Sequence, residues 1–293
     1  MMAFSHSFRR WTTGVILGLA VLRAAAPAEE AGEDQAAVAQ RELKEIINRQ
    51  QTLLQSATKP GFKLEDAAVR LQLETICREY DLLTRDNPNF APAYAAYGYL
   101  LGRLDMRKES MVMLLKANQL DPNDPLVKNQ LGNFLAEDGK PLEAVNYFIA
   151  AIKLAPREPL YHYQLGTLLY EARDDFLKNG VYTAEQLETA MHQAFKNAAE
   201  LAPDRIEFTY RYAESFYDLS KPDWDGALRA WAALEDRAPT PVERETMRLH
   251  AANVLIKQGR LELARVLLGT VSDPALTGQK EKLIAQLPEK PKQ

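Results

Sequence analysis

The sequence contains a single cysteine, Cys77, among 293 residues. One thiol cannot form an internal disulfide, so packing alone has to stabilise the folded chain. No cysteine lies near the N-terminal region, which excludes lipid attachment of the lipoprotein kind there. Cys77 is expected to be a small, buried apolar residue, with a reactive thiol as the alternative.

Motifs of common catalytic and nucleotide-binding sites are also missing. The four histidines do not stand in an HExxH pattern, and no GxGxxG, phosphate-loop, GxSxG or paired-cysteine motif occurs. No cofactor or metal site is therefore predicted, and the chain is not expected to be an enzyme.

Positive charge is in short supply. Lysine and arginine number 36 against 40 acidic residues, so the formal net charge is −4. This balance argues against binding to nucleic acid or to an anionic membrane surface as the main task. With 46% hydrophobic and 26% charged residues, the composition is that of a soluble chain with a substantial core.

The N-terminal region has the pattern of a secretory signal peptide over residues 1–28. Arg9 and Arg10 precede the run WTTGVILGLAVL at 11–22, and small residues follow up to Ala28. Twelve apolar residues fall short of the roughly 20 that span a bilayer, which favours a cleaved signal peptide over a membrane anchor. Once this segment is removed, no stable membrane insertion is expected. Residues 29–34 are expected to form a flexible mature N-terminus. An uncleaved inner-membrane anchor at 11–22 is the alternative.

Two residue types recur with a period of 34. Proline stands at positions 88, 122 and 156, and glycine at positions 98, 132 and 166. In "LDPNDP" and "LAPREP" the first proline ends one helix and the second begins the next, because proline lacks an N–H but suits the first helical turn. Apolar residues between these markers follow helical spacing. Each period therefore predicts a pair of helices.

The repeat positions resemble those of the tetratricopeptide repeat family. Segment 125–158, for example, carries the family's pattern at Leu131, Gly132, Leu135, Ala144, Phe148, Ala151 and Pro156. The resemblance covers about residues 64–272 and implies an all-α, right-handed solenoid of about six antiparallel helix pairs. The predicted organisation is an atypical pair at 35–88, repeats at 91–124, 125–158 and 159–205, degenerate repeats at 206–241 and 242–287, the last with a capping helix, and a tail at 288–293.

In this family the first helix of each pair lines a concave groove that holds a partner segment. The matching positions are Tyr99, Asn129, Asn133, Tyr163, Thr167, Tyr170, Tyr210, Glu214, Tyr217 and Asn253. Tyrosine offers a flat surface with a hydroxyl, and asparagine can bond a peptide backbone. The alternative is that several tyrosines pack between neighbouring helices. Acidic groove residues outnumber basic ones, so a neutral or basic segment is expected rather than a C-terminal carboxylate.

The third repeat departs from the family by an insertion at 174–189. Asn179-Gly180 has the pattern of a helix end, and Thr183 to Gln186 that of a helix start. Both helices of this repeat are therefore expected to be longer than in its neighbours. Apolar residues at the extended tip would either contact a partner or pack against the adjacent pair.

Taken with the resemblance, these features predict a non-catalytic scaffold or adaptor that binds a protein or peptide segment. The signal-like N-terminus indicates export, to the periplasm or outside the cell, and a role in bacterial cell-envelope assembly or secretion. Two alternatives stay open: an enzyme acting on envelope polymers or a small-ligand carrier, and a membrane-tethered assembly factor. The oligomeric state is left open.

Overall fold

The computed structural model describes residues 30–56 and 66–288, with side chains from residue 35 onward. Every regular element within these ranges is an α-helix or a short 3₁₀-helix, as the all-α prediction requires. The chain divides into two compact units, residues 1–140 and 141–293. The boundary falls between the two predicted helices of repeat 125–158.

The first unit contains antiparallel helical hairpins that share one core. Its described helices are α1 (Glu30–Ser56), α2 (Ala67–Asp86), α3 (Ala91–Arg103), α4 (Arg107–Leu120) and α5 (Pro125–Glu137). Ile46, Tyr80 and Tyr97 are buried together, and the two tyrosine rings stack at a centroid distance of 5.1 Å. The Tyr80 hydroxyl donates to Oε1 of Gln50 at 2.7 Å, which satisfies both groups inside the core. This contact ties α1 to α2.

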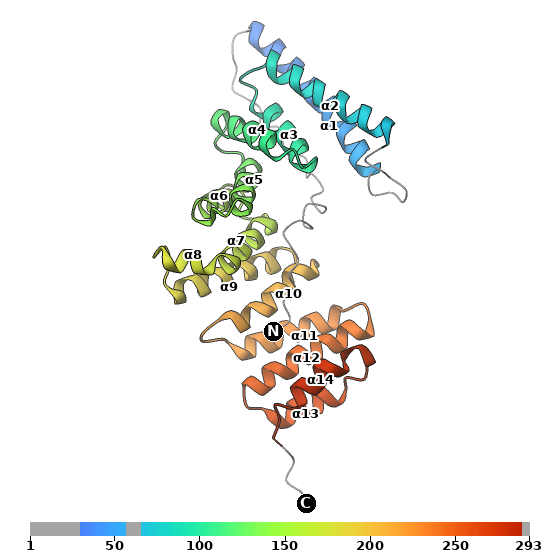
Figure 1. Cartoon of the computed structure of the whole chain (residues 1–293), viewed down its shortest axis with the longest axis vertical. Helices are drawn as coiled ribbons and strands as arrows, with labels where there is room; N and C mark the ends of the chain where they lie inside the picture. The colour runs from blue at the N-terminus through green and yellow to red at the C-terminus, as the bar shows by residue number, and fades with distance from the viewer. Residues whose placement is uncertain (1–29, 57–65, 289–293) are drawn as a thin grey trace, which may run out of the picture. The chain divides into compact units, whose positions relative to one another are not determined.

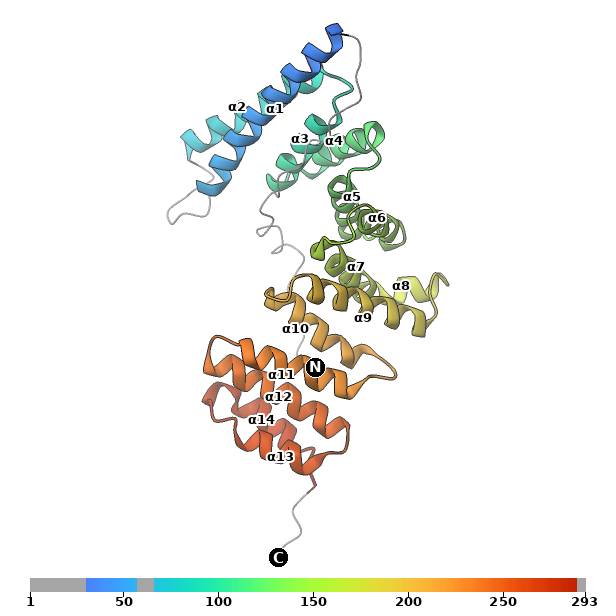
Figure 2. The same ribbon diagram turned by 180° about the vertical axis from the view of Figure 1, so that it is seen from behind.

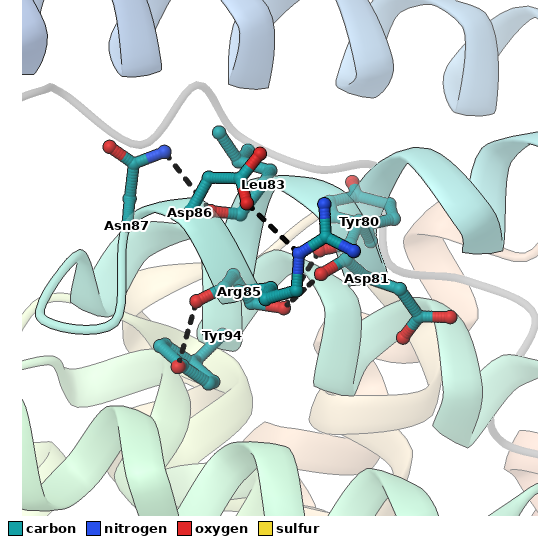
Figure 3. A network of polar contacts seen from close by, with 8 residues as sticks. Tyr80, Asp81, Leu83, Arg85, Asp86, Asn87 and Tyr94 are labelled. Atoms are coloured by element: carbon teal, nitrogen blue, oxygen red, sulfur yellow. Dashed lines mark hydrogen bonds and ion pairs between the residues drawn. The ribbon is translucent and has the colours of Figure 1, made fainter.

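The junction between α2 and α3 is closed by polar contacts (Figure 3). Asn87 is the C-terminal cap of α2, and both its backbone N–H and its side-chain Nδ2 donate to the carbonyl of Leu83. The Tyr94 hydroxyl donates to the carbonyl of Thr84 at 3.1 Å. The carbonyl groups of Leu83 and Thr84, near the end of α2, thereby accept hydrogen bonds, and the bond from Tyr94 holds α3 against α2.

The second unit is a series of helices that follow one another in chain order (Figure 1). Its described elements are α6 (Pro141–Leu154), α7 (Pro159–Glu171), α8 (Arg173–Lys178), α9 (Ala184–Leu201), α10 (Ile206–Ser215), η2 (Phe216–Asp218), α11 (Trp224–Arg237), α12 (Pro241–Lys257), α13 (Leu261–Gly269), η3 (Pro274–Leu276) and α14 (Thr277–Ile284). Figure 2 shows the same order from behind. The final helix, α14, packs against α12 and α13, as predicted for a capping helix.

The insertion lengthens only the second of the two helices predicted to be longer. Helix α9, which begins at Ala184, has 18 residues, whereas α7 has 13 residues, as α5 does, and the short separate helix α8 follows it after a break at Ala172. The predicted capping box is confirmed: Thr183 and Gln186 exchange side-chain to backbone hydrogen bonds. Phe176 is fully buried and its ring meets Tyr182 edge-on at 5.7 Å. Helix α8 packs on α6 of the preceding repeat as well as on α7 and α9 of its own, which agrees with packing against the adjacent pair, although Val181 at the tip is exposed.

Four helix ends share one left-handed turn. Gly139, Gly180 and Gly259 have φ near +70°, and the residue after each donates its N–H five residues back. This is the Schellman pattern. The fourth turn has Asp105 at φ +60°, thirty-four residues before Gly139, with the same backbone hydrogen bonds. A non-glycine residue therefore holds a strained conformation at this repeat.

Close helix contacts explain the periodic glycines. A Cβ atom at Gly98 would lie 2.8 Å from Cγ of Leu114, and one at Gly166 would lie 2.8 Å from Cε1 of Phe195. Both partners are buried on the second helix of the same repeat. Glycine therefore lets the paired helices approach more closely than any larger residue would allow.

One boundary differs from the prediction. Helix α1 begins at Glu30, so residues 30–34 are helical rather than flexible. The predicted signal peptide and most of the tail lie outside the described residues. Within 30–56 and 66–288, no helix combines the length and hydropathy needed to cross a membrane.

Candidate functional site

The first helices of three successive repeats, α7, α10 and α12, adjoin one another in the second unit. The ring of Tyr163 on α7 lies 4.7 Å from that of Phe208 on α10. Tyr210 on α10 reaches α12, where its hydroxyl lies 2.9 Å from Nε2 of His250. These contacts place the predicted positions on α7, α10 and α12 along one surface, which we call the first-helix surface.

Arg211 is the centre of this surface. Its guanidinium lies 4.3 Å from the ring centre of Tyr170 and 4.4 Å from that of Phe195, and it pairs with Asp218 at 3.0 Å. Only 16% of its side chain is exposed. A cation held between two rings and a carboxylate is well ordered. Tyr170 itself is 47% exposed, so it presents a supported aromatic face to solvent.

Carboxylates surround Arg211. Burial raises the pKa of Glu214 and of Asp218 above their usual ranges, while Arg211 opposes that rise in both. Burial likewise raises the pKa of Glu171, again against the effect of Arg211. One guanidinium therefore faces three carboxylates. Carboxyl groups therefore outnumber cations in this cluster.

Three of the predicted tyrosines pack between helices instead of facing solvent. Tyr163 contacts Phe195 and Phe208, and Tyr210 meets Trp231 edge-on at 5.2 Å. The Tyr217 hydroxyl donates to the backbone carbonyl of His250 at 3.1 Å. Their hydroxyls and rings mainly fix the spacing of α7, α10 and α12, which was the alternative interpretation from the sequence.

The remaining predicted residues of the second unit lie at its partly exposed positions. Thr167 donates to the carbonyl of Tyr163 at 3.0 Å. Asn253 is partly buried and hydrogen-bonds the Tyr217 side chain. Of the predicted set in the second unit, Tyr170 is therefore exposed, and Thr167, Glu214 and Asn253 are partly exposed.

In the first unit the predicted residues do not form a comparable surface. The Tyr99 hydroxyl donates to the carbonyl of Leu126 at 3.1 Å. Asn129 departs from the prediction, because at 1% exposure a bound segment would not reach it. The Oδ1 atoms of Asn129 and Asn133 are both buried without a hydrogen-bond partner in the described structure. These two amides line the interior side of α5.

Arg211 and His250 make several contacts at the site, but neither occupies a position that the repeat pattern predicts to face the groove. Arg211 is next to a predicted groove position but is not one itself, and His250 lies three residues before Asn253. His250 stacks on Trp231 at 4.0 Å with nearly parallel rings, and burial lowers its pKa to about 4. Only the contacts between repeats reveal their roles. Among the residues described, no group of histidine, cysteine and carboxylate side chains is arranged to hold a metal ion.

Comparison with known proteins agrees with this architecture. The tetratricopeptide repeat model matches residues 91–124, and no curated protein matches the chain. YrrB, described as a TPR protein with an unusual peptide-binding site, is 17% identical with a TM-score of 0.54, covering 70% of this chain and 91% of YrrB. PilF of Pseudomonas aeruginosa is 14% identical with a TM-score of 0.54, covering 87% and 99% respectively. The predicted fold class, an all-α repeat solenoid, is confirmed.

Proposed function

We propose that this chain, a tetratricopeptide-repeat protein, is a non-catalytic scaffold that binds a neutral or basic segment of a partner protein. The segment would lie along the first-helix surface of the second unit. The observation that carries the proposal is the arrangement around Arg211, where an exposed Tyr170 ring stands beside the carboxylates of Glu171, Glu214 and Asp218.

The chemistry of this surface suits peptide recognition. Tyr170 is held in place by Arg211, so little side-chain entropy is lost when a partner packs against its ring. The partly buried carboxylates attract a lysine or arginine more strongly than exposed ones do, because water screens them less. Arg211 is already paired with Asp218, so it is not free to bind a partner carboxylate.

We further propose that the protein is exported and acts in cell-envelope assembly or secretion. This rests on the order of Arg9, Arg10, the apolar run 11–22 and the small residues before Ala28. N-terminal sequencing of protein purified from the native host tests it. A mature chain that begins near residue 29 supports export, and one that still carries residues 1–28 contradicts cleavage.

The binding surface is tested by photo-crosslinking in the native host. A photoreactive phenylalanine analogue at position 170 should form adducts with a protein partner, whereas the same group at exposed Glu143 on α6 should not. Adducts only at position 143 would place the contact on the outer helices and contradict the proposal.

The expected charge of the segment is tested with the crosslinked peptide identified by mass spectrometry. Glu214→Lys should weaken its binding by about tenfold, the effect of reversing one charge beside a partly desolvated cation. Glu143→Lys makes the same charge change away from the surface and should leave Kd unchanged. Equal effects of the two variants would indicate only a long-range electrostatic attraction.

A further inference from the structure

A pocket lies on the opposite side of α10 from the first-helix surface. Tyr212 and Phe216 are four residues apart and face it, whereas Tyr210 and Glu214 are turned about 200° away, toward the first-helix surface. Residues of α9 and α11 complete a pocket of about 450 Å³, which is the size of small-ligand sites in proteins. This outer pocket is lined by His192, Lys196, Tyr212, Gly226, Arg229 and Ala230, with Phe216 beneath.

Small residues on α11 leave room for the pocket. Gly226 and Ala230 are four residues apart on one face of this helix, and both line the outer pocket. A Cβ at Gly226 would lie 2.5 Å from Oδ2 of Asp223 and 3.1 Å from Cε1 of Phe216. A side chain at Gly226 would therefore collide with Asp223 and Phe216.

The pocket contains a histidine with a defined tautomer. The Ser215 hydroxyl donates to the carbonyl of Tyr212 at 2.7 Å, and its only proton is used in that bond. His192 must therefore carry its proton on Nδ1, which donates to Oγ of Ser215 at 2.7 Å. Its Nε2 is then an acceptor, and no described residue donates to it. The imidazole stays neutral near pH 7, since burial lowers its pKa to about 4.

The charged groups of the pocket favour an anion. Lys196 pairs only loosely with Glu200 at 3.7 Å, and Arg229 with Asp223 at 3.4 Å. Asp223 is also engaged by α11, because its Oδ1 accepts the N–H of Gly226 at 2.9 Å as the helix cap. Within the lining, Lys196 and Arg229 therefore stand against the single carboxylate of Asp223, because Glu200, the distant partner of Lys196, is not part of the lining.

We propose that the outer pocket binds a small aromatic carboxylate that carries a hydroxyl group. The carboxylate would pair with Lys196 and Arg229, the ring would pack against Tyr212, and the hydroxyl would donate to Nε2 of His192. The site is independent of the first-helix surface, because it uses the other face of α10. It makes the protein a receptor for a small acid in addition to any protein partner.

The test uses 4-hydroxybenzoate as the probe, titrated into the full chain and followed by calorimetry. We expect a Kd of about 1 mM or below, typical of a ligand with about ten non-hydrogen atoms. Benzoate, without the hydroxyl, and 4-hydroxybenzamide, without the charge, should each bind about tenfold more weakly. Equal binding of all three, or no binding of the probe, would overturn the proposal.

Variants locate the binding. Ala230→Phe fills the outer pocket without removing a polar group and should abolish binding of the probe. Arg229→Gln, an exposed substitution that is compatible with folding, should weaken the binding about tenfold by removing one charged partner. Glu143→Gln, at an exposed position of α6 outside the pocket lining, should leave it unchanged. If Ala230→Phe keeps the helical circular dichroism spectrum of the parent and still binds 4-hydroxybenzoate, the ligand binds elsewhere and the assignment is wrong.

Discussion

A Cβ atom added to Gly166 on α7 would lie 2.8 Å from Cε1 of Phe195 on α9. The ring of Phe195 has no exposed surface. A methyl group at this position would overlap the ring, and Phe195 cannot move away because it is enclosed on all sides. The same relationship joins Gly98 to Leu114 in an earlier repeat. The periodic glycine therefore sets the spacing of paired helices.

Gly166→Ala should lower the free energy of unfolding of the second unit by about 1–2 kcal/mol, because overpacking outweighs the better helix propensity of alanine. Urea denaturation followed by the fluorescence of Trp224 and Trp231 measures the change. Gly269→Ala is the control, since this position has open space around it and should show no loss. Adding Phe195→Leu to Gly166→Ala should recover part of the stability, and failure to do so would contradict the steric explanation.

Asp105→Gly should raise the free energy of unfolding of the first unit by about 0.5–1 kcal/mol. Asp105 has φ +60°, a left-handed conformation that costs a non-glycine residue about 1 kcal/mol. Thermal denaturation followed by circular dichroism tests this. Gly139→Ala is the reciprocal control and should destabilise, because φ is +71° there although nothing lies within 4 Å. A loss of stability in Asp105→Gly would mean that the aspartate side chain contributes more than the strain.

The stability of the second unit should fall as the pH drops below 6.5. Burial lowers the pKa of His250 to about 4, so between pH 6.5 and 4 the unfolded chain binds a proton that the folded chain excludes. His250 faces the neutral rings of Tyr210, Tyr217 and Trp231. Its contribution to the loss between pH 7 and 5 should be about 2 kcal/mol. Urea titrations at several pH values should show a shallower pH dependence for His250→Gln, and an unchanged slope would refute the assignment.

Glu188→Gln should destabilise the junction between the insertion and α11 by about 1–3 kcal/mol, the cost of leaving buried partners without their charged acceptor. Glu188 is only 7% exposed, its Oε1 lies 2.6 Å from Arg173 of α8, and its Oε2 accepts the N–H of Ser220 at 2.8 Å. Burial opposes ionisation, yet these two donors lower its pKa.

The measurement is hydrogen exchange at Ser220 and its neighbours, which should become faster in Glu188→Gln. Glu185→Gln replaces an exposed acidic residue one turn earlier on the same helix and should leave the exchange unchanged. Protection that is equal in both variants would show that the 219–222 connection is held by other contacts.

Local signals explain what was predicted correctly. The cap at Thr183 and the helix starts at Pro125 and Pro159 depend on a few neighbouring residues, and each is found in the structure. The helical start of α1 was missed because residues 30–34 look polar and unpatterned.

Local signals did not predict which residues of the first-helix surface are exposed. Repeat positions selected Tyr163, Tyr210 and Tyr217 equally with Tyr170, yet only Tyr170 is left largely exposed. The spacing of a residue along one helix cannot show how much of it the next helix covers. Arg211 and the outer pocket were missed for the same reason, since both are formed by residues from three different helices.

The amino-acid sequence alone determined the repeated helical hairpins, because a 34-residue period of glycine and proline encodes helix ends and close helix contacts locally. Tertiary structure decided which polar and aromatic residues face solvent, how carboxylates gather around Arg211, and where His192 keeps an open acceptor. Those outcomes depend on distances between residues that are far apart in the chain, and burial then sets their charge and accessibility.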